Sequence, residues 1–214
     1  ALQLIQSADI VLENFRPGTM AKLGLDYDSL KSMHPRLIYC SLKGFLSGPY
    51  ENRVALDEVT QMMGGLAYMT GLPERPLRAG SSVIDITGGM FGVIAILSAL
   101  HERQTTDVGS HITSALFETA ACLVGQPMAQ QAVSGEAPPP VFVRQSAWAI
   151  YDVFQLDSGE RLFVGIVSDS LWYRFCEEFE LAEWAADDSL STNAGRVVAR
   201  EHLLEAINRL FSPM

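Results

Sequence analysis

The sequence predicts an α/β protein with a parallel sheet, followed by a proline-rich linker and a smaller α+β domain. Two helix–strand repeats occur within about the first 45 residues, where strand-like apolar segments cover residues 10–13 and 37–42. A third such segment, residues 110–116, follows a long apolar helix. Strands this apolar that arrive from helices are typical of parallel sheets covered on both faces.

The composition indicates a compact protein with a sizeable core. The 214 residues are 48% hydrophobic and 19% charged, and the net charge is −10. This charge argues against nucleic acid or an anionic membrane as a partner, whereas a phosphate-bearing small molecule needs only a few local cations. No apolar run reaches the length of roughly 18 residues that a membrane span needs. No secretory signal opens the chain, so we expect a cytoplasmic protein.

Cysteine and histidine give no sign of a metal centre. Three scattered cysteines without a CxxC pair predict reduced, buried thiols. The four histidines lack the spacing of metal ligands, so we expect no metal. His111, alone in a strand-like segment, is expected to be a hydrogen-bonded packing residue.

The chain is organised around residues 83–100, VIDITGGMFGVIAILSAL. Asp85 ends an apolar run, and the helix that follows is apolar on every side, which predicts burial nearly all round. An acid at this place lies where the helix macrodipole favours its ionised form. Gly88 and Gly89 leave backbone N–H groups approachable by a ligand. The alternative is that Asp85 is merely the N-cap of the helix.

Two loops follow predicted strands. Residues 14–18, Asn-Phe-Arg-Pro-Gly, leave the first strand, and residues 43–45, Lys-Gly-Phe, leave the second. Ligands of open α/β sheets bind at the carboxyl ends of the strands. The alternative for the first loop is an ordinary strand-to-helix turn made by proline and glycine.

The sequence divides into a large α/β domain at 1–131, a linker at 132–147 and a small α+β domain at 148–214. Three consecutive prolines at 138–140 mark the linker, since they sustain neither a helix nor a central strand. Helices are expected at 57–67 and 117–131 in the large domain. In the small domain, a hairpin of residues 148–155 and 161–166 precedes amphipathic helices at 171–179 and 201–211.

Several stretches match one family in order: ADIVLENFRPGTMAKLGL, HPRLIYCSLKGF, MMGGLAYMTG, SSVIDITGGMFGVIAILSALHER with VGSHITSALFETA, and AWAIYDVFQLDSGERLFVGI. The sequence resembles the family III CoA-transferases, the group of formyl-CoA and carnitine CoA-transferases that includes the α-methylacyl-CoA racemases. The resemblance implies a Rossmann-like large domain and an interlocked homodimer. Family chains have a first strand–helix unit and a C-terminal return to the large domain that are missing here, so we expect a fragment.

The resemblance also implies roles for particular residues. Asp85 falls on the family's nucleophile, and Gly88 and Gly89 then become candidate oxyanion donors. CoA and acyl-CoA are implied as substrates, with a carboxylic acid as acceptor and no permanently bound cofactor. The residues implied to contact CoA are Asn14, Phe15, Arg16 and Lys22 for the nucleotide, and Arg53, Val54, Ala55, Leu56 and Asp57 beside the pantetheine arm.

One departure separates the two activities of the family. The racemase branch has a histidine at the position of Leu56, and leucine moves no proton. Racemisation through an α-proton needs two proton-transfer groups, so we favour CoA transfer. A racemase or epimerase of the same fold, and an inactive CoA-binding fragment, are the alternatives.

Overall fold

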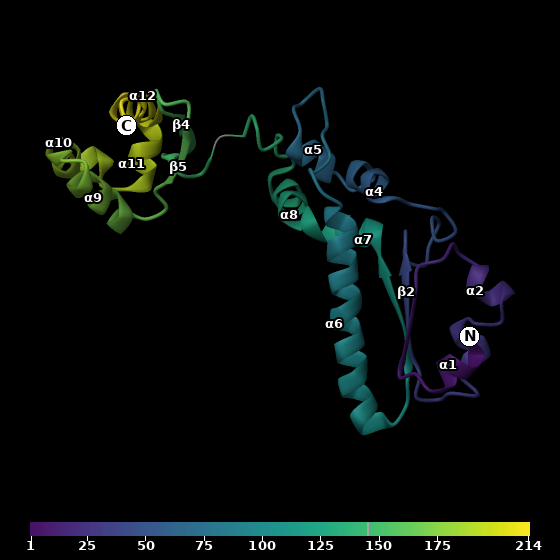
Figure 1. Ribbon diagram of the computed structural model, residues 1–214. Coiled ribbons are helices and arrows are strands. Elements are labelled where there is room, and N and C mark those ends of the chain that lie inside the picture. The colour runs from purple at the N-terminus through teal and green to yellow at the C-terminus, as the bar shows by residue number, and fades with distance from the viewer. Residues whose placement is uncertain (145) are drawn as a thin grey trace. The chain divides into compact units, whose positions relative to one another are not determined.

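The computed structural model of the protein describes residues 1–144 and 146–214. The chain divides into two compact units, Ala1–Arg144 and Gln145–Met214 (Figure 1). The first unit contains three strands, β1 (Ile10–Glu13), β2 (Ile38–Lys43) and β3 (Ser110–Ala115). Its helices are α1 (Leu2–Gln6), α2 (Thr19–Lys22), α3 (Tyr27–Leu30), α4 (Asp57–Met63), α5 (Leu66–Thr70), α6 (Val83–Thr106), α7 (Leu116–Leu123) and α8 (Gly125–Ser134).

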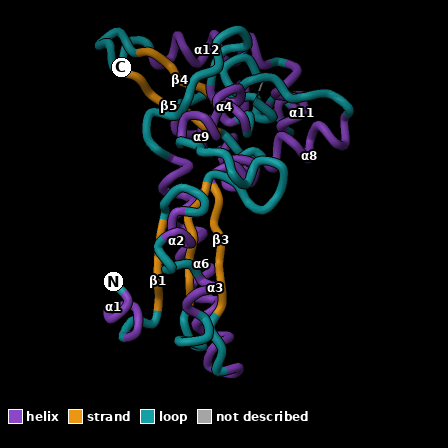
Figure 2. Tube along the Cα trace, turned by 90° about the vertical axis from the view of Figure 1, so that its right-hand side faces the viewer, coloured by secondary structure: helices purple, strands orange, loops and turns teal. Residues whose placement is uncertain are grey.

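The strands form one parallel sheet in the order β1-β2-β3, and they lie side by side in Figure 2. The register places Leu12 opposite Cys40 and Cys40 opposite Ile112. The predicted α/β class with a parallel sheet is therefore confirmed. The strand segments were predictable because each is a short run rich in β-branched and aliphatic residues.

Helices cover both faces of this sheet. On one face, Tyr39 and Leu37 of the β2 region pack with Leu30 of α3 and, more peripherally, with Val11 and Met20. On the other face lies α6, which precedes β3 in the chain and packs against both β2 and β3 (Figure 1). Because α6 runs back between two parallel strands, its first turn lies at their carboxyl ends.

The expectation that α6 is buried nearly all round is wrong for this chain. The residues facing the sheet and α7 are mostly small and recur at helical spacing: Ile84, Gly88, Gly92 and Ala99. A Cβ atom at position 92 would lie 3.1 Å from Leu42 Cδ2. The opposite side remains exposed, with Met90 at 59% and Leu97 at 60%. By length and composition alone α6 could cross a membrane, although its sequence holds no uninterrupted apolar run of that length.

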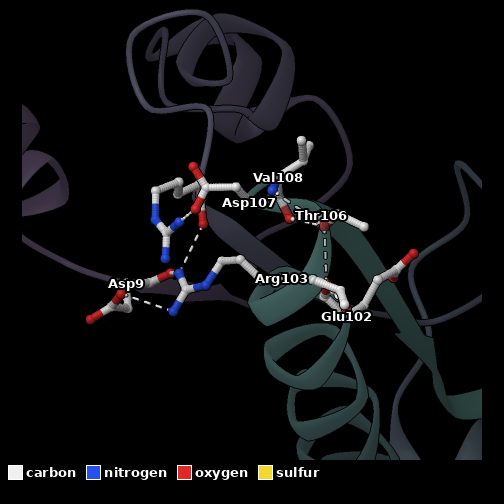
Figure 3. Close-up of polar contacts among 8 residues, drawn as sticks. Asp9, Glu102, Arg103, Thr106, Asp107 and Val108 are labelled. Carbon is white, nitrogen blue, oxygen red and sulfur yellow. Dashed lines mark hydrogen bonds and ion pairs between the residues drawn. The ribbon is translucent and has the colours of Figure 1, made fainter.

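The far end of α6 is tied to the amino-terminal edge of the sheet (Figure 3). Arg103, only 8% exposed, donates to the backbone oxygen of Arg36 at 2.9 Å and to Asp9 Oδ1 at 2.9 Å. Asp107, the next residue after the helix, forms an ion pair with Arg36. These contacts fix the direction of α6 at the end opposite Asp85.

Two predicted helices are each broken in two. The segment 57–67 divides into α4 and α5 because Gly65 adopts a φ of 85°, which ordinary residues avoid. The segment 117–131 divides at Val124, and Pro127 in the first turn of α8 has no N–H to continue α7. Helix α8 then extends to Ser134, beyond the expected start of the linker at 132. The Val141 N–H donates to the Met69 oxygen at 2.9 Å, so this segment is attached to the first unit.

The second unit has a two-stranded antiparallel sheet, β4 (Tyr151–Gln155) and β5 (Arg161–Gly165). Its helices are α9 (Asp169–Glu178), α10 (Ala182–Ala186), η1 (Asp188–Leu190), α11 (Asn193–Val198) and α12 (Arg200–Phe211). Trp172, Leu203 and Ile207 are fully buried in its core. The short elements between α9 and α12 were not predicted, because none is long enough to carry a helical period. Cys176 and Cys40 are buried as expected, but Cys122 is exposed.

Candidate active site at the carboxyl edge of the sheet

A cavity of about 610 Å³ opens at the carboxyl ends of the three strands. The loop after β1, the end of β2, the segment before α4, the first turns of α6 and the end of β3 all contribute to it. Its lining residues are Asn14, Phe15, Arg16, Pro17, Leu42, Lys43, Gly44, Arg53, Val54, Ala55, Leu56, Asp85, Gly88, Gly89, Ser114 and Leu116. The cavity therefore lies where parallel α/β sheets bind their ligands.

Most of the residues singled out in the sequence meet in this cavity. The loop residues Asn14, Phe15 and Arg16 line it, as do residues 53–56, Asp85 and both glycines. Lys22 does not line it; this side chain lies in the last turn of α2. Asp57 does not line it either, because its side chain is buried behind the first turn of α6.

Asp85 is the third residue of α6, in the first turn of the helix. The alternative that Asp85 caps this helix is wrong, since the N-cap position is occupied by Ser82. The carboxylate of Asp57 caps the helix instead. Its Oδ2 accepts hydrogen bonds from the N–H of Ile84 at 2.8 Å and from the N–H of Asp85 at 3.0 Å. The side chain of Asp85 is thus left for the cavity.

Asp57 is itself held in place. It is the first residue of α4 and is only 3% exposed. Its Oδ1 accepts a hydrogen bond from the Gln61 amide one turn later. The Gln61 oxygen in turn accepts the Ala79 N–H at 2.8 Å, which ties down the loop that leads into α6. These bonds join two segments nearly 30 residues apart at the point where Asp85 begins.

The pKa of Asp85 is raised above its usual value. Partial burial is the main cause, and the negative charges of Asp57 and Glu58 add to it. The expectation that the helix macrodipole favours the ionised form of Asp85 is therefore not met. The N-terminal N–H groups that would favour the charge of Asp85 already face the carboxylate of Asp57.

The expectation that Gly88 and Gly89 offer free N–H donors is wrong. The helix begins at Val83, so both glycines lie inside it, where each N–H bonds to the carbonyl four residues earlier. Their contribution to the site is space. No atom lies within 4 Å of a Cβ built on Gly89, and the Gly88 oxygen accepts a bond from Ser114 Oγ at 2.7 Å.

The sequence placed Lys43 and Gly44 in a loop at a strand end without giving either an individual role, and it did not single out Ser114. Gly44 allows a close approach, because a Cβ there would lie 2.7 Å from the Ala55 Cβ. Ser114 could have been found from its place near the carboxyl end of β3. Among the described residues that line the cavity, three are cationic, Arg16, Lys43 and Arg53, and Asp85 is the one carboxylate.

No histidine is among the described lining residues. His111 lies in β3 opposite Tyr39, where its Nε2 is 3.1 Å from Ser41 Oγ and its ring stacks on Tyr27 with centroids 5.2 Å apart. Burial lowers its pKa. Leu56, exposed to the cavity, occupies the position that the resemblance assigns to the histidine of the racemases.

The cavity at the carboxyl ends of the strands combines one acidic side chain with three cationic ones. Such a site can bind an anionic ligand and place a carboxylate beside it. Comparison with known proteins identifies the family to which this α/β unit belongs. The model of CoA-transferase family III matches residues 1–213. The chain belongs to this family.

Its relatives include the acetyl-CoA:oxalate CoA-transferase of Acetobacter aceti, which is 32% identical over 99% of this chain and 55% of its own length. The succinate–glutarate CoA-transferase of Agrobacterium fabrum is also 32% identical, over 96% of this chain and 52% of its own. A crystal structure of a CAIB/BAIF family protein from Brucella suis has a TM-score of 0.82 and 34% identity, covering 99% of this chain and 56% of that one. The chain thus spans about half the length of the curated relatives that it matches.

Proposed function

We propose that this chain carries the nucleophile and part of the CoA site of an acyl-CoA:carboxylate CoA-transferase. The observation that carries the proposal is the position of Asp85, the one carboxylate among the described lining residues, beside three cationic side chains. The names of the relatives support the reaction class.

The reaction uses Asp85 as a covalent acceptor. A carboxylate oxygen of Asp85 attacks the thioester carbonyl carbon, the C–S bond breaks, and a mixed anhydride and CoA thiolate result. The thiolate then attacks the Asp85 carbonyl carbon and releases the donor acid, which leaves an aspartyl-CoA thioester. The acceptor carboxylate attacks this thioester, the C–S bond breaks, and a second mixed anhydride and CoA thiolate result. The thiolate then attacks the acceptor's acyl carbon, which forms the new acyl-CoA and releases the Asp85 carboxylate. Burial favours the attack because it strips water from a weak nucleophile.

The cations have separate tasks in this reaction. Arg16 and Arg53 form no ion pair within the described part of the chain. The charge of Arg16 is available to the phosphates of CoA, whereas Arg53, which lies over the Tyr50 ring, belongs to the segment beside the pantetheine arm. In a chain of net charge −10, such a local excess of positive charge is what an anionic ligand requires.

The racemase alternative lacks a second proton-transfer group. Leu56 is apolar, and neither a histidine nor a second carboxylate is found among the described lining residues. Racemisation would need a base on each side of the α-carbon. A CoA-binding fragment without activity is the other alternative.

Isotope exchange tests the proposal without knowledge of the acceptor. The protein is incubated with acetyl-CoA and ¹³C-acetate, and separately with succinyl-CoA and ¹³C-succinate, in D₂O. A transferase moves ¹³C into the acyl-CoA. Deuterium at the α-carbon without ¹³C transfer would support the racemase. Calorimetric binding of CoA with neither isotope incorporated would support a binding fragment.

A further inference from the structure

Glu13 is a buried acid just outside the cavity. It is the last residue of β1, and its side chain is 3% exposed. A buried carboxylate is costly unless it is paired and hydrogen-bonded, so its partners indicate what it does. Nothing in the proposed reaction uses this residue.

The first partner is Lys43, the last residue of β2. Its Nζ lies 2.7 Å from Glu13 Oε1 and 2.8 Å from Oε2. It also donates to the backbone oxygen of Phe15 at 2.9 Å. The three protons of the ammonium group therefore have three acceptors. Although Lys43 lines the cavity, its donors are directed at Glu13 and at the loop.

The second partner of Glu13 is the same loop residue. The Phe15 N–H donates to Glu13 Oε2 at 2.9 Å. Both backbone groups of Phe15 are thus held by one ion pair, the N–H by Glu13 and the C=O by Lys43. Charged partners make the stronger kind of hydrogen bond. Asn14 and Arg16, the neighbours of Phe15, line the cavity.

We propose that the Glu13–Lys43 ion pair is a positioning device that holds the loop of residues 14–17 in its CoA-binding conformation. The inference rests on the proposed function for the identity of the ligand. Lys43 acts in it through the loop, so it is a positioning residue. The competing explanation is that Lys43 itself binds a CoA phosphate and that Glu13 only stores its charge.

The variant Glu13→Gln separates these explanations. The glutamine side chain keeps an oxygen for the Phe15 N–H but loses the attraction to Lys43. We expect the Kd for CoA, measured by calorimetry, to rise about tenfold, since one charge-assisted contact to the loop is lost. Covalent labelling of Asp85 at saturating acyl-CoA should proceed at the parent rate, because Asp85 is held from Asp57. A global loss of structure would impair both binding and labelling.

The matched control is Asp9→Asn, which breaks the ion pair between Asp9 and Arg103 at the opposite edge of the same sheet. It should leave the Kd unchanged. The double variant Glu13→Gln with Lys43→Gln should bind CoA no more weakly than Glu13→Gln, because both changes release the same loop. A Kd for CoA about tenfold higher in the double variant than in Glu13→Gln, or a lower Kd in Glu13→Gln than in the parent, would overturn the proposal in favour of direct phosphate binding by Lys43.

Hydrogen exchange provides a readout that needs no CoA. The amides of residues 14–16 should exchange faster in Glu13→Gln than in the parent and in Asp9→Asn. Unchanged exchange in Glu13→Gln would contradict the positioning role, whether or not the parent binds CoA. Failure of the parent to bind CoA would count against the proposed function and not against the positioning role. If Glu13→Gln does not fold, Glu13→Asp keeps the charge while withdrawing it from Phe15. The same rise in exchange is then expected.

Discussion

The carboxylate of Asp57 accepts the backbone N–H of Asp85 at 3.0 Å, although 28 residues separate them in the chain. The same oxygen accepts the N–H of Ile84. Asp57 thus caps the N-terminus of the helix that carries Asp85. The charge of Asp57 also raises the pKa of Asp85, in addition to the larger effect of burial. The stability of this part of the fold and the reactivity of the site are coupled through that contact.

Removal of the Asp57 carboxylate should destabilise the fold. In Asp57→Ala the N–H groups of Ile84 and Asp85 lose their acceptor, which we expect to cost about 1–3 kcal/mol in the free energy of unfolding. Urea denaturation measures this cost. The control is Glu58→Ala at the next position, where a half-exposed pair with Arg78 is worth about 0–1 kcal/mol. Equal losses in the two variants would contradict the capping role of Asp57.

The raised pKa of Asp85 predicts a pH-dependent effect of Asp85→Asn on stability. A carboxyl group whose pKa is higher in the folded than in the unfolded chain favours folding when protonated. That contribution is complete below the unfolded pKa of about 3.9 and is lost as the pH rises through the folded value. Asp85→Asn should therefore gain stability relative to the parent between acidic and neutral pH. Urea denaturation of both proteins across this pH range measures the difference. If the urea midpoint of Asp85→Asn instead falls relative to that of the parent as the pH rises, the pKa of Asp85 is not raised.

Arg16 and Lys22 test where CoA binds. Arg16 lines the cavity and Lys22 does not. Arg16→Met should raise the Kd for CoA about tenfold, as expected for the loss of one charged contact. Lys22→Met, which removes the same charge from an exposed position, should change the Kd less than about twofold. A larger effect at Lys22 than at Arg16 would place the nucleotide on α2 rather than in the cavity.

Gly44 tests the close approach of the loop after β2 to the segment before α4. A Cβ at this position would lie 2.7 Å from the Ala55 Cβ and 3.1 Å from the Ala55 nitrogen. Gly44→Ala should therefore displace the wall of the cavity and cost about 1–3 kcal/mol in unfolding free energy. Gly125→Ala, where no atom lies within 4 Å, is the control and should cost nothing. Thermal unfolding of the two variants checks the difference, and a Gly44→Ala protein as stable as the control would refute the close approach.

The sheet and most of the cavity were predictable because they depend on local patterns. Short aliphatic runs marked the strands, and parallel strands bring their carboxyl ends together, so the loops of residues 14–18 and 43–45 could be expected at one edge. The roles of Asp57 and Lys43 could not be predicted in this way. Each acts on a backbone group far away in sequence, and such contacts leave no periodic signal.

Two errors came from local reasoning about α6. The sequence placed the start of the helix after Asp85, whereas the helix already begins at Val83. That shift placed Gly88 and Gly89 inside the helix and removed their N–H groups from the site. The apolar composition of α6 predicted cover on all sides, but composition does not report which residues provide it. In this chain β2, β3 and α7 cover one side.

The most direct test of the central claim is mass spectrometry of the protein after incubation with acetyl-CoA or succinyl-CoA. We predict a CoA thioester on the peptide that contains Asp85, which hydroxylamine removes and which is absent from Asp85→Asn. Labelling of Asp85→Asn at the same rate as the parent, or CoA attached to another residue, would contradict the assignment of Asp85 as the nucleophile.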